Sequence, residues 1–161
     1  IANKNLPTHK LFKHLGADPL EKDFLPEYLA TKLKNKKTDI KIAIMDQRVI
    51  VGVGKSYASE SVYHAGINPK RHARSCKREE IVRLVAAIQK TLKAAIRAGG
   101  SSLRDYRRAD GELGYFQHNF AVYERSGKPC PDCNCDIAKT GGILQITQGG
   151  RSTYFCAARQ K

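Results

Sequence analysis

Four cysteines near the C-terminal end limit the possible folds of this chain more than any other feature. They occur as Cys130-Pro-Asp-Cys133-Asn-Cys135 and, after a glycine-rich stretch, as Cys156. Four thiolates are the number that a closed tetrahedral zinc site requires, and a CxxC pair is typical of one half of a zinc ribbon. We therefore expect a small β module that binds Zn²⁺ as its cofactor, with one ion per chain.

The sequence leaves the set of metal ligands open. Cys156 is followed by Ala-Ala-Arg159, so no second CxxC pair is present. Cys130 can pair with Cys133 or with Cys135, or all four cysteines can bind one ion together. A hairpin held by packing alone, without metal, is the alternative to each of these arrangements.

The net charge indicates a polyanionic partner. The 161 residues include 29 Lys and Arg against 15 Asp and Glu, which gives a formal net charge of +14. Such a charge repels itself in a compact fold, and nucleic acid is the usual polyanion that neutralises it. The sequence has no apolar run long enough to span a bilayer and no signal-peptide pattern. We therefore expect nucleic acid as the partner, no membrane, and a cytoplasmic location.

Apolar periodicity predicts a mainly α fold before the cysteines. The clearest helix is expected over 79–98, where apolar residues form one stripe that Gly99-Gly100 ends. Arg48–Gly54 is rich in β-branched residues, but its two glycines favour a tight turn over a strand. Shorter helices are expected over 24–33, after Thr38, and over 56–65.

The pattern changes after residue 100. Residues 101–119 are polar and rich in glycine and arginine, which predicts a loop. Alternation over Phe120–Arg125 predicts a strand, and Gly149-Gly150 predicts the turn of a β-hairpin. We therefore divide the chain into a helical domain over 1–100, a loop or linker over 101–119, and a zinc-finger-like β-hairpin module over 120–161.

One glycine-rich turn has the features of a phosphate site. Gly52-Val-Gly54-Lys55 stands directly before an expected helix. Glycines let backbone amides approach a phosphate oxygen, and the helix N-terminus and Lys55 both favour an anion. The alternative is an ordinary tight turn between helices. Basic residues expected near the turn are Lys36, Lys37, Lys41, Lys70 and Arg71.

Arginines mark two further candidate contacts with nucleic acid. Arg151 follows the predicted hairpin turn, which puts it at an exposed tip from which it can enter a groove. Arg104, with Arg107 and Arg108, forms a second cluster in the predicted loop. For both, the alternative is a solvated surface charge.

Seven segments of the chain carry a resemblance to a known family. They are Thr38–Asp46, Val51–Glu60, Ala65–Pro69, Gly99–Leu103, Asp110–Phe116, Val122–Cys130 and Gly150–Cys156. In this order they resemble the C-terminal half of bacterial formamidopyrimidine-DNA glycosylases. The fold that this resemblance implies is a helix–two-turns–helix bundle followed by a zinc-finger hairpin.

The resemblance implies a bifunctional enzyme of base-excision repair. Such an enzyme flips 8-oxoguanine and formamidopyrimidines out of duplex DNA, cuts the glycosidic bond, and then cuts the backbone at the abasic site. In the family, the amine of an N-terminal proline is the nucleophile. This chain begins with Ile1-Ala2 and lacks that domain. We therefore expect the chain alone to bind damaged or abasic duplex DNA, as a monomer at the bacterial nucleoid, but to be inactive as a glycosylase and lyase.

The resemblance also implies roles for individual residues. Cys130 and Cys156 match zinc ligands. The DNA-binding positions are Lys41 near the damage pocket, Gly52, Gly54 and Lys55 in a phosphate-gripping turn, Arg104 near the extruded base, Leu103–Phe116 in the loop that covers this base, and Arg151 at the minor groove.

Two positions depart from the family pattern. Lys55 stands where the family has an asparagine, and Arg159 stands where it has its fourth zinc cysteine. A lysine still binds phosphate but lacks the donor and acceptor pair of an amide. An arginine does not replace a thiolate, so Cys135 is the remaining candidate for the fourth ligand.

Two functions of other classes stay open. One is a stand-alone, non-enzymatic nucleic-acid-binding module, which the sequence upstream of Ile1 would distinguish from a glycosylase. The other is a structural protein that binds structured RNA with the same two-turn motif. A preference for duplex DNA that contains an abasic analogue would argue against it.

Overall fold

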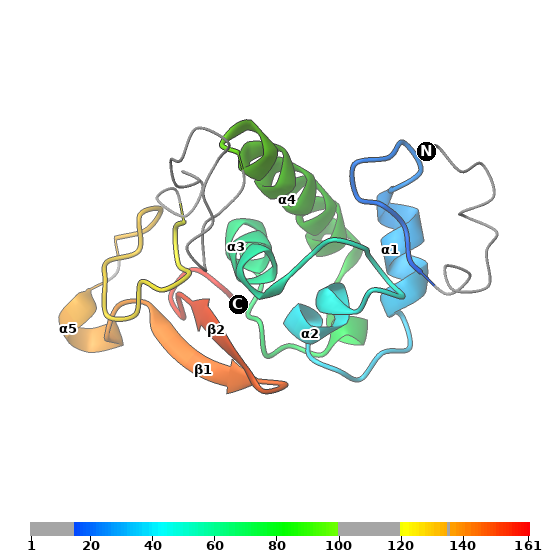
Figure 1. Cartoon of the computed structure of the whole chain (residues 1–161). Helices are drawn as coiled ribbons and strands as arrows, with labels where there is room; N and C mark the ends of the chain where they lie inside the picture. Colours follow the sequence, from blue (N-terminus) through cyan, green and yellow to red (C-terminus); the bar gives the residue numbers. More distant parts are fainter. Residues whose placement is uncertain (1–14, 100–119, 135) are drawn as a thin grey trace.

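A short series of helices precedes one β-hairpin, as expected (Figure 1). The computed structural model describes residues 15–99, 120–134 and 136–161. The elements are α1 (Pro26–Leu33), α2 (Ile40–Met45), α3 (Lys55–Ala65), the 3₁₀ helix η3 (Ala73–Ser75), α4 (Arg78–Arg97), α5 (Ile137–Thr140), β1 (Leu144–Gln148) and β2 (Arg151–Phe155). The mainly α fold with a small β module is confirmed.

Helix α4 is the long helix that the apolar stripe predicts. Its buried face consists of residues such as Ile81, Leu84 and Ile88, which recur at helical spacing. At its N-terminal end, Glu80 accepts the backbone N–H of Lys77 at 2.8 Å, which satisfies one of the donors that a helix start leaves free. Figure 1 shows α4 packed across α3 and α1, so this face forms the centre of the helical core.

The segment between α2 and α3 is a turn, as its glycines predict. Only one isolated β-bridge occurs there among the described residues, between Ala17 and Ile50. Gly52 has a φ of +83°, a conformation that residues with a side chain rarely adopt. The turn therefore needs Gly52, and β propensity does not decide its structure.

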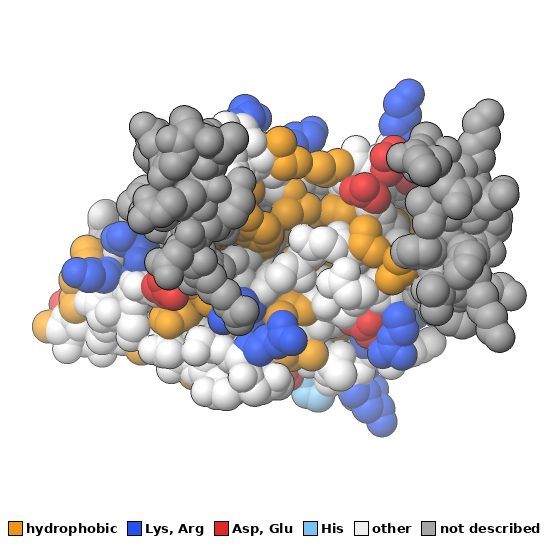
Figure 2. Space-filling model, viewed as in Figure 1, with side chains coloured by type: hydrophobic (Ala, Val, Ile, Leu, Met, Phe, Trp, Pro, Cys, Tyr) orange, Lys and Arg blue, Asp and Glu red, His pale blue; other side chains and the backbone are white. Residues whose placement is uncertain are grey.

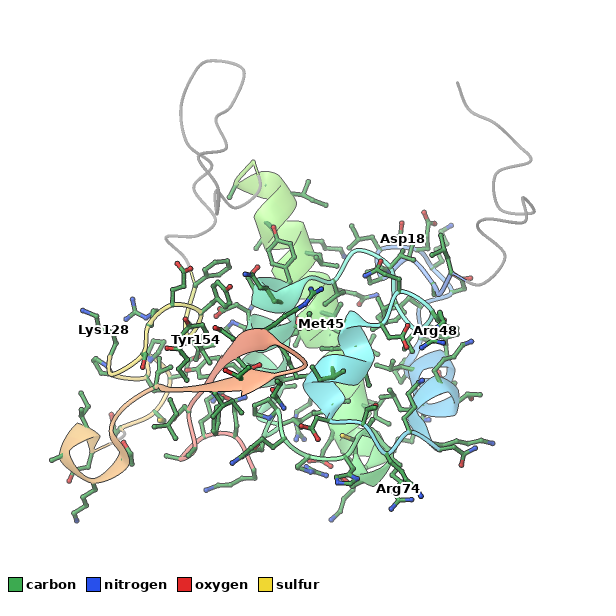
Figure 3. All side chains as sticks on the ribbon, turned by 60° about the horizontal axis from the view of Figure 1, so that its bottom comes forward. Asp18, Met45, Arg48, Arg74, Lys128 and Tyr154 are labelled. Carbon is green, nitrogen blue, oxygen red and sulfur yellow. The ribbon has the colours of Figure 1, made fainter. Side chains whose placement is uncertain are left out.

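The hairpin packs on the helical domain. Strands β1 and β2 pair antiparallel, with Gln148 opposite Arg151. The Tyr154 ring, labelled in Figure 3, meets the Tyr123 ring with centroids 5.0 Å apart. One buried cluster joins α3, α4, residues 120–123 and the hairpin; its members are Tyr63, Ala95, Phe120, Ala121, Val122, Tyr123, Cys130, Ile143, Tyr154 and Cys156.

The expected strand over Phe120–Arg125 is wrong. These residues form bends and turns, and Glu124 has a φ of +61°. The backbone N–H groups of Ala121, Val122 and Tyr123 donate to the carboxylate of Glu60, at 2.7–3.0 Å. Because one side chain binds all three donors, they are not available to a strand ladder.

No helix in the described ranges combines the length and the apolar character that crossing a membrane would require. The predicted loop over 101–119 lies outside the described residues.

Candidate nucleic-acid interface and metal centre

Three cations from three elements converge beside the hairpin. They are Lys41 in α2, Lys55 at the start of α3, and Arg151 at the start of β2. Lys41 has no exposed surface, whereas Lys55 and Arg151 are exposed. Burial and the charges of Arg151 and Lys55 lower the pKa of Lys41 to about 8. The three charges are therefore close enough to repel one another, which is typical of a site that receives an anion.

The environment of Lys41 offers little compensation for its charge. Its Nζ donates to the carbonyl oxygen of Ser152 at 3.5 Å, which is a long hydrogen bond. Within the part of the chain that the structure describes, none of the salt bridges includes this ammonium group. An anionic group close to this ammonium would offset the cost of burying its charge.

The Gly52–Lys55 turn is open towards solvent. A Cβ placed at Gly52 or at Gly54 would have no atom within 4 Å. Gly54 is the N-cap of α3 and makes no side-chain cap hydrogen bond, so the positive end of the helix dipole lies beside this space. The N–H of Gly52 itself donates to the side-chain oxygen of Gln47 at 3.1 Å. The N-terminal end of α3, and not the N–H of Gly52, is therefore the candidate anion site of this turn.

The hairpin turn lies against α2. Gly149 and Gly150 have φ values of +57° and +77°, as a two-residue hairpin turn requires, so the predicted tip is confirmed. A Cβ on Gly149 would come within 3.1 Å of Ile42 in α2. The side-chain amide of Gln148 donates to Asp39 at 2.8 Å and to the carbonyl oxygen of Pro69 at 3.1 Å. These contacts fix the tip, and with it Arg151, on the helical domain.

A groove separates the tip from the end of α2. It has a volume of about 390 Å³, and Lys36, Met45, Arg48 and Arg151 are among the residues that line it. Figure 3 labels Met45 beside the hairpin turn and Arg48 further towards α1. Three of these four side chains carry a positive charge, and Asp46 partly offsets it by accepting from the Arg48 guanidinium at 2.9 Å.

A second hollow is apolar and unsuited to phosphate. It has a volume of about 460 Å³ between α4 and the Gly52 turn, and Leu20, Tyr57, Leu92 and Ile96 contribute to its walls. Figure 2 shows hydrophobic side chains gathered in the middle of this face, with the Lys and Arg side chains around them. A phosphate group is therefore expected at the basic residues and not in this hollow.

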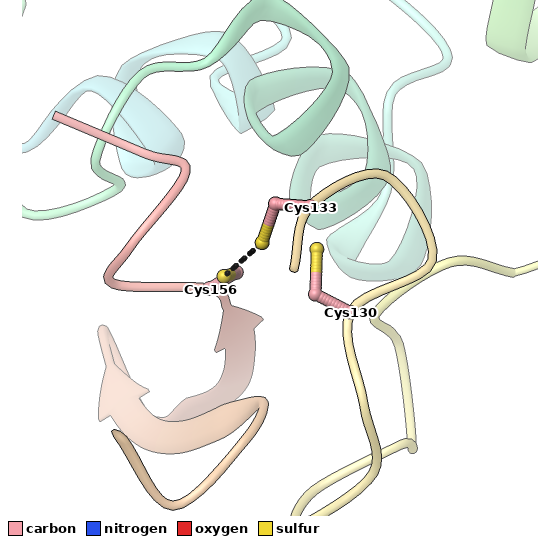
Figure 4. Close-up of side chains that lie close together, drawn as sticks. All are labelled: Cys130, Cys133 and Cys156. Atoms are coloured by element: carbon pink, nitrogen blue, oxygen red, sulfur yellow. Dashed lines mark hydrogen bonds between the residues drawn. The ribbon is translucent and has the colours of Figure 1, made fainter. Parts of the chain in front are cut away.

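Three cysteines form a candidate metal centre. The Sγ atoms of Cys130, Cys133 and Cys156 lie within 4.8 Å of one another, and those of Cys133 and Cys156 are 3.6 Å apart (Figure 4). A tetrahedral zinc ion with bonds of about 2.3 Å to sulfur separates its ligands by about 3.8 Å. The three sulfurs fit three corners of such a site.

The chemistry of the thiols bears on this centre. Burial raises the pKa of the Cys156 thiol, whereas a bound cation would favour the thiolate. The hydroxyl of Tyr63 lies 2.8 Å from the Cys130 sulfur. Cys135 and Arg104, both predicted from the sequence as site residues, lie outside the described residues.

Sequence reasoning missed Glu60. Its side chain is 2% exposed and holds residues 121–123 through three backbone N–H groups. Burial raises the pKa of Glu60, and the three hydrogen bonds and the Arg125 charge act against this effect. A local signal existed, because Glu60 lies between small and apolar residues in α3 that are buried with it.

Comparison with known proteins gives a consistent result. The family described as the formamidopyrimidine-DNA glycosylase H2TH domain matches residues 15–107. A formamidopyrimidine-DNA glycosylase of Rhodospirillum rubrum is 51% identical over 158 residues, which are 98% of this chain and 56% of that protein. One of Ruegeria pomeroyi is 44% identical over 161 residues, 100% of this chain and 56% of the relative. The chain thus spans little more than half the length of these relatives.

Solved structures agree with this family. MutM (Fpg) of Thermus thermophilus has a TM-score of 0.83 and 37% identity, and the match covers 98% of this chain and 56% of that one. The Fpg of Lactococcus lactis in complex with abasic-site DNA has a TM-score of 0.85 and 30% identity over 100% of this chain and 57% of that one. From the match over residues 15–107 and these structures, we conclude that the chain belongs to the formamidopyrimidine-DNA glycosylase family and carries its H2TH domain.

Proposed function

We propose that this chain is the DNA-binding part of a base-excision-repair enzyme, a DNA glycosylase and abasic-site lyase that removes 8-oxoguanine and formamidopyrimidines from duplex DNA. The observation that carries the proposal is the convergence of Lys41, Lys55 and Arg151 on one side of the hairpin. Relatives of the same fold were solved with DNA that contains Fapy-dG or an abasic site.

In this proposal, each cation has a separate task. Lys55 and the N-terminal end of α3 bind a backbone phosphate. Arg151 enters the minor groove from the hairpin tip and contacts phosphates around the lesion. Lys41 binds an anionic or electron-rich group near the damage pocket, and Arg104 has the role of contacting the extruded base. The chain binds as a monomer and works at the chromosomal DNA of a bacterial cell.

The catalytic step that the family resemblance implies uses the amine of an N-terminal proline. This chain matches 56% of the length of the Rhodospirillum rubrum relative. We therefore expect the chain to bind abasic duplex DNA without cutting it. Borohydride treatment of the mixture tests this expectation, because it traps a Schiff base between an amine and the sugar. A covalent adduct between this chain and abasic DNA would contradict it.

Replacing Arg151 with alanine is expected to weaken binding to abasic duplex DNA by about tenfold to a hundredfold, because one groove and phosphate contact is lost. The wild-type chain should show a log–log salt slope near −4.5 for about five phosphate contacts, and the variant a slope smaller by about 1. Binding measured by fluorescence anisotropy over a series of salt concentrations checks both values.

The matched control for Arg151 is Lys139→Ala. Lys139 is also exposed, but it lies in α5, at the end of the finger away from the hairpin turn (Figure 1). The control should bind as the wild type does. Equal losses of DNA affinity in both variants would indicate that only the net charge matters. A wild-type log–log salt slope near zero would contradict the proposed phosphate contacts.

Zinc is the metal that we propose for the cysteine centre, with Cys130, Cys133 and Cys156 as ligands and Cys135 as the fourth. It would act as a structural ion that links the turn carrying Cys130 and Cys133, called here the cysteine knuckle, to the hairpin. Reduced chain is expected to hold one zinc per molecule, and Cys130→Ser should lose most of it. Elemental analysis after gel filtration checks this result. Cys76→Ser is the control, because Cys76 belongs to the helical core and not to the centre.

A further inference from the structure

The last residues of the chain fold back onto the end of α3. The side-chain oxygen of Gln160 accepts the backbone N–H of Cys156 at 2.7 Å, and its amide donates to the carbonyl oxygen of Ile67 at 2.9 Å. Lys161 donates its backbone N–H to Gly66 at 3.1 Å. Gln160 is 1% exposed, so these hydrogen bonds lie away from water. The base of the hairpin is therefore attached to the helical domain by protein contacts.

Arg159 completes this attachment. Its Nε donates to the carbonyl oxygen of Tyr63 at 3.2 Å and a terminal nitrogen donates to that of His64 at 3.3 Å. These carbonyls belong to the last turn of α3, where backbone acceptors lack helical partners and the helix dipole favours a cation. The guanidinium carbon also lies 4.9 Å from the centroid of the Tyr63 ring, within the range of a cation–π contact.

Tyr63 extends the contact to the cysteine knuckle. Its ring and carbonyl face Arg159, and its hydroxyl lies 2.8 Å from the Cys130 sulfur. The same hydroxyl accepts the backbone N–H of Asp132 at 3.2 Å. Tyr63 has no exposed surface. One buried side chain thus joins the C-terminal segment, α3 and the knuckle that carries Cys130.

Arg159 occupies the position that a second metal-binding cysteine of this segment would occupy. In a second CxxC pair that began at Cys156, the partner cysteine would be residue 159. We propose that Arg159, acting through Tyr63, fastens the finger to α3 in place of a fourth metal ligand at that position. The finger then keeps its place on the helical domain whether or not the cysteine centre holds zinc.

This inference goes beyond the proposed function, because it concerns how the finger is held and not what it binds. The tip of the hairpin is fixed independently by Gln148, which donates to Asp39 and Pro69. Protein contacts therefore attach both the tip and the base of the hairpin to the helical domain, and together they fix the orientation of Arg151. Arg159 is in this sense a positioning residue for the DNA contact.

Hydrogen exchange of the whole chain tests the proposal. The chain is treated with a reductant and a zinc chelator, and exchange is followed at the amides of β1 and β2, with the α4 amides as an internal reference. We expect the metal-free wild type to exchange within about threefold of the zinc-loaded chain. Arg159→Ala should accelerate exchange of β1 and β2 by at least about tenfold without metal, since it removes two hydrogen bonds and the ring contact.

Two further variants separate the possible outcomes. Arg159→Lys keeps the charge but lacks the planar fork, and it should restore protection only partly. In Arg159→Cys, the protection of the hairpin amides from exchange should depend on zinc. The substitution removes the contacts of Arg159 with Tyr63 and His64 and supplies a further thiolate. Lys139→Ala is the control and should leave the exchange unchanged.

The proposal is overturned if the wild-type hairpin loses its protection when zinc is removed while the α4 amides keep theirs. It is also overturned if Arg159→Ala exchanges as the wild type does. If Arg159→Ala does not fold, the comparison of the wild-type chain with and without zinc tests the proposal by itself. Hydrogen exchange is measured without DNA, so a failure of DNA binding would refute the proposed function and leave this result unaffected.

Discussion

Replacing Glu60 with alanine is expected to lower the free energy of unfolding by about 3–5 kcal/mol. The carboxylate binds the backbone N–H groups of Ala121, Val122 and Tyr123, and all four residues are buried. A buried donor that loses its acceptor costs about 1–3 kcal/mol, and an acceptor shared by three donors has no nearby substitute. Urea unfolding followed by circular dichroism measures the loss.

Two other variants show whether the hydrogen bonds cause the effect. Glu60→Gln keeps the size of the side chain but replaces one oxygen with an NH₂ group that faces a backbone donor, so we expect an intermediate loss. Glu21→Gln is the control, because Glu21 is exposed. A Glu60→Ala variant as stable as this control would show that residues 120–123 do not depend on the carboxylate.

Replacing Lys41 with methionine is expected to raise stability and to weaken DNA binding. A pKa near 8 in the fold, against 10.5 for the free side chain, corresponds to a destabilisation of about 3 kcal/mol when the ammonium is buried in its charged form. Methionine has a similar length and no charge, so the variant should gain up to about 3 kcal/mol at pH 7. Its affinity for abasic duplex DNA should fall by about tenfold.

The control for Lys41 is Lys34→Met, at an exposed position in the loop after α1. It should change neither the unfolding free energy nor the DNA affinity by more than a small fraction of these effects. If Lys41→Met lost both stability and affinity, the lysine would be a structural residue. The proposed role near the damage pocket would then be wrong.

The pH dependence of stability gives an independent measurement of Lys41. Its pKa is lower in the folded chain than in the unfolded one, so the unfolded state binds more protons between about pH 8 and pH 10.5. The contribution of Lys41 should therefore increase the free energy of unfolding as pH rises through this range, and should be flat below it. The difference between wild type and Lys41→Met, measured at pH 7 and at pH 10, isolates this contribution from other titrating groups.

Local sequence rules were sufficient where the structure depends on nearby residues. The apolar residues of α4 recur every three to four positions. This spacing places them on one face of an α-helix, so burial of that face predicts the helix directly. The turn at Gly149-Gly150 follows from positive φ values that glycine adopts without strain. The cysteine spacing predicted a site shared by up to four thiolates and left the ligand set open, and three of the four sulfurs lie together in the structure.

The strand expected over Phe120–Arg125 shows where such rules fail. The same alternation of apolar and polar residues is found in a strand and in a segment whose backbone N–H groups donate to a distant side chain. That acceptor, Glu60, lies about sixty residues earlier in the chain. Nothing within a window of ten residues distinguishes the two cases.

The order of the helices, the hairpin with its tip, and the cysteine knuckle were thus determined by the sequence alone, because each depends on backbone preferences and spacing within a short stretch. Only the tertiary structure decided that Lys41 is buried beside two other cations, that Glu60 holds residues 121–123, and that Arg159 lies on Tyr63. These contacts join residues far apart in the chain. Their free energy arises from excluding water from a particular set of neighbours, and that set exists only after the chain has folded.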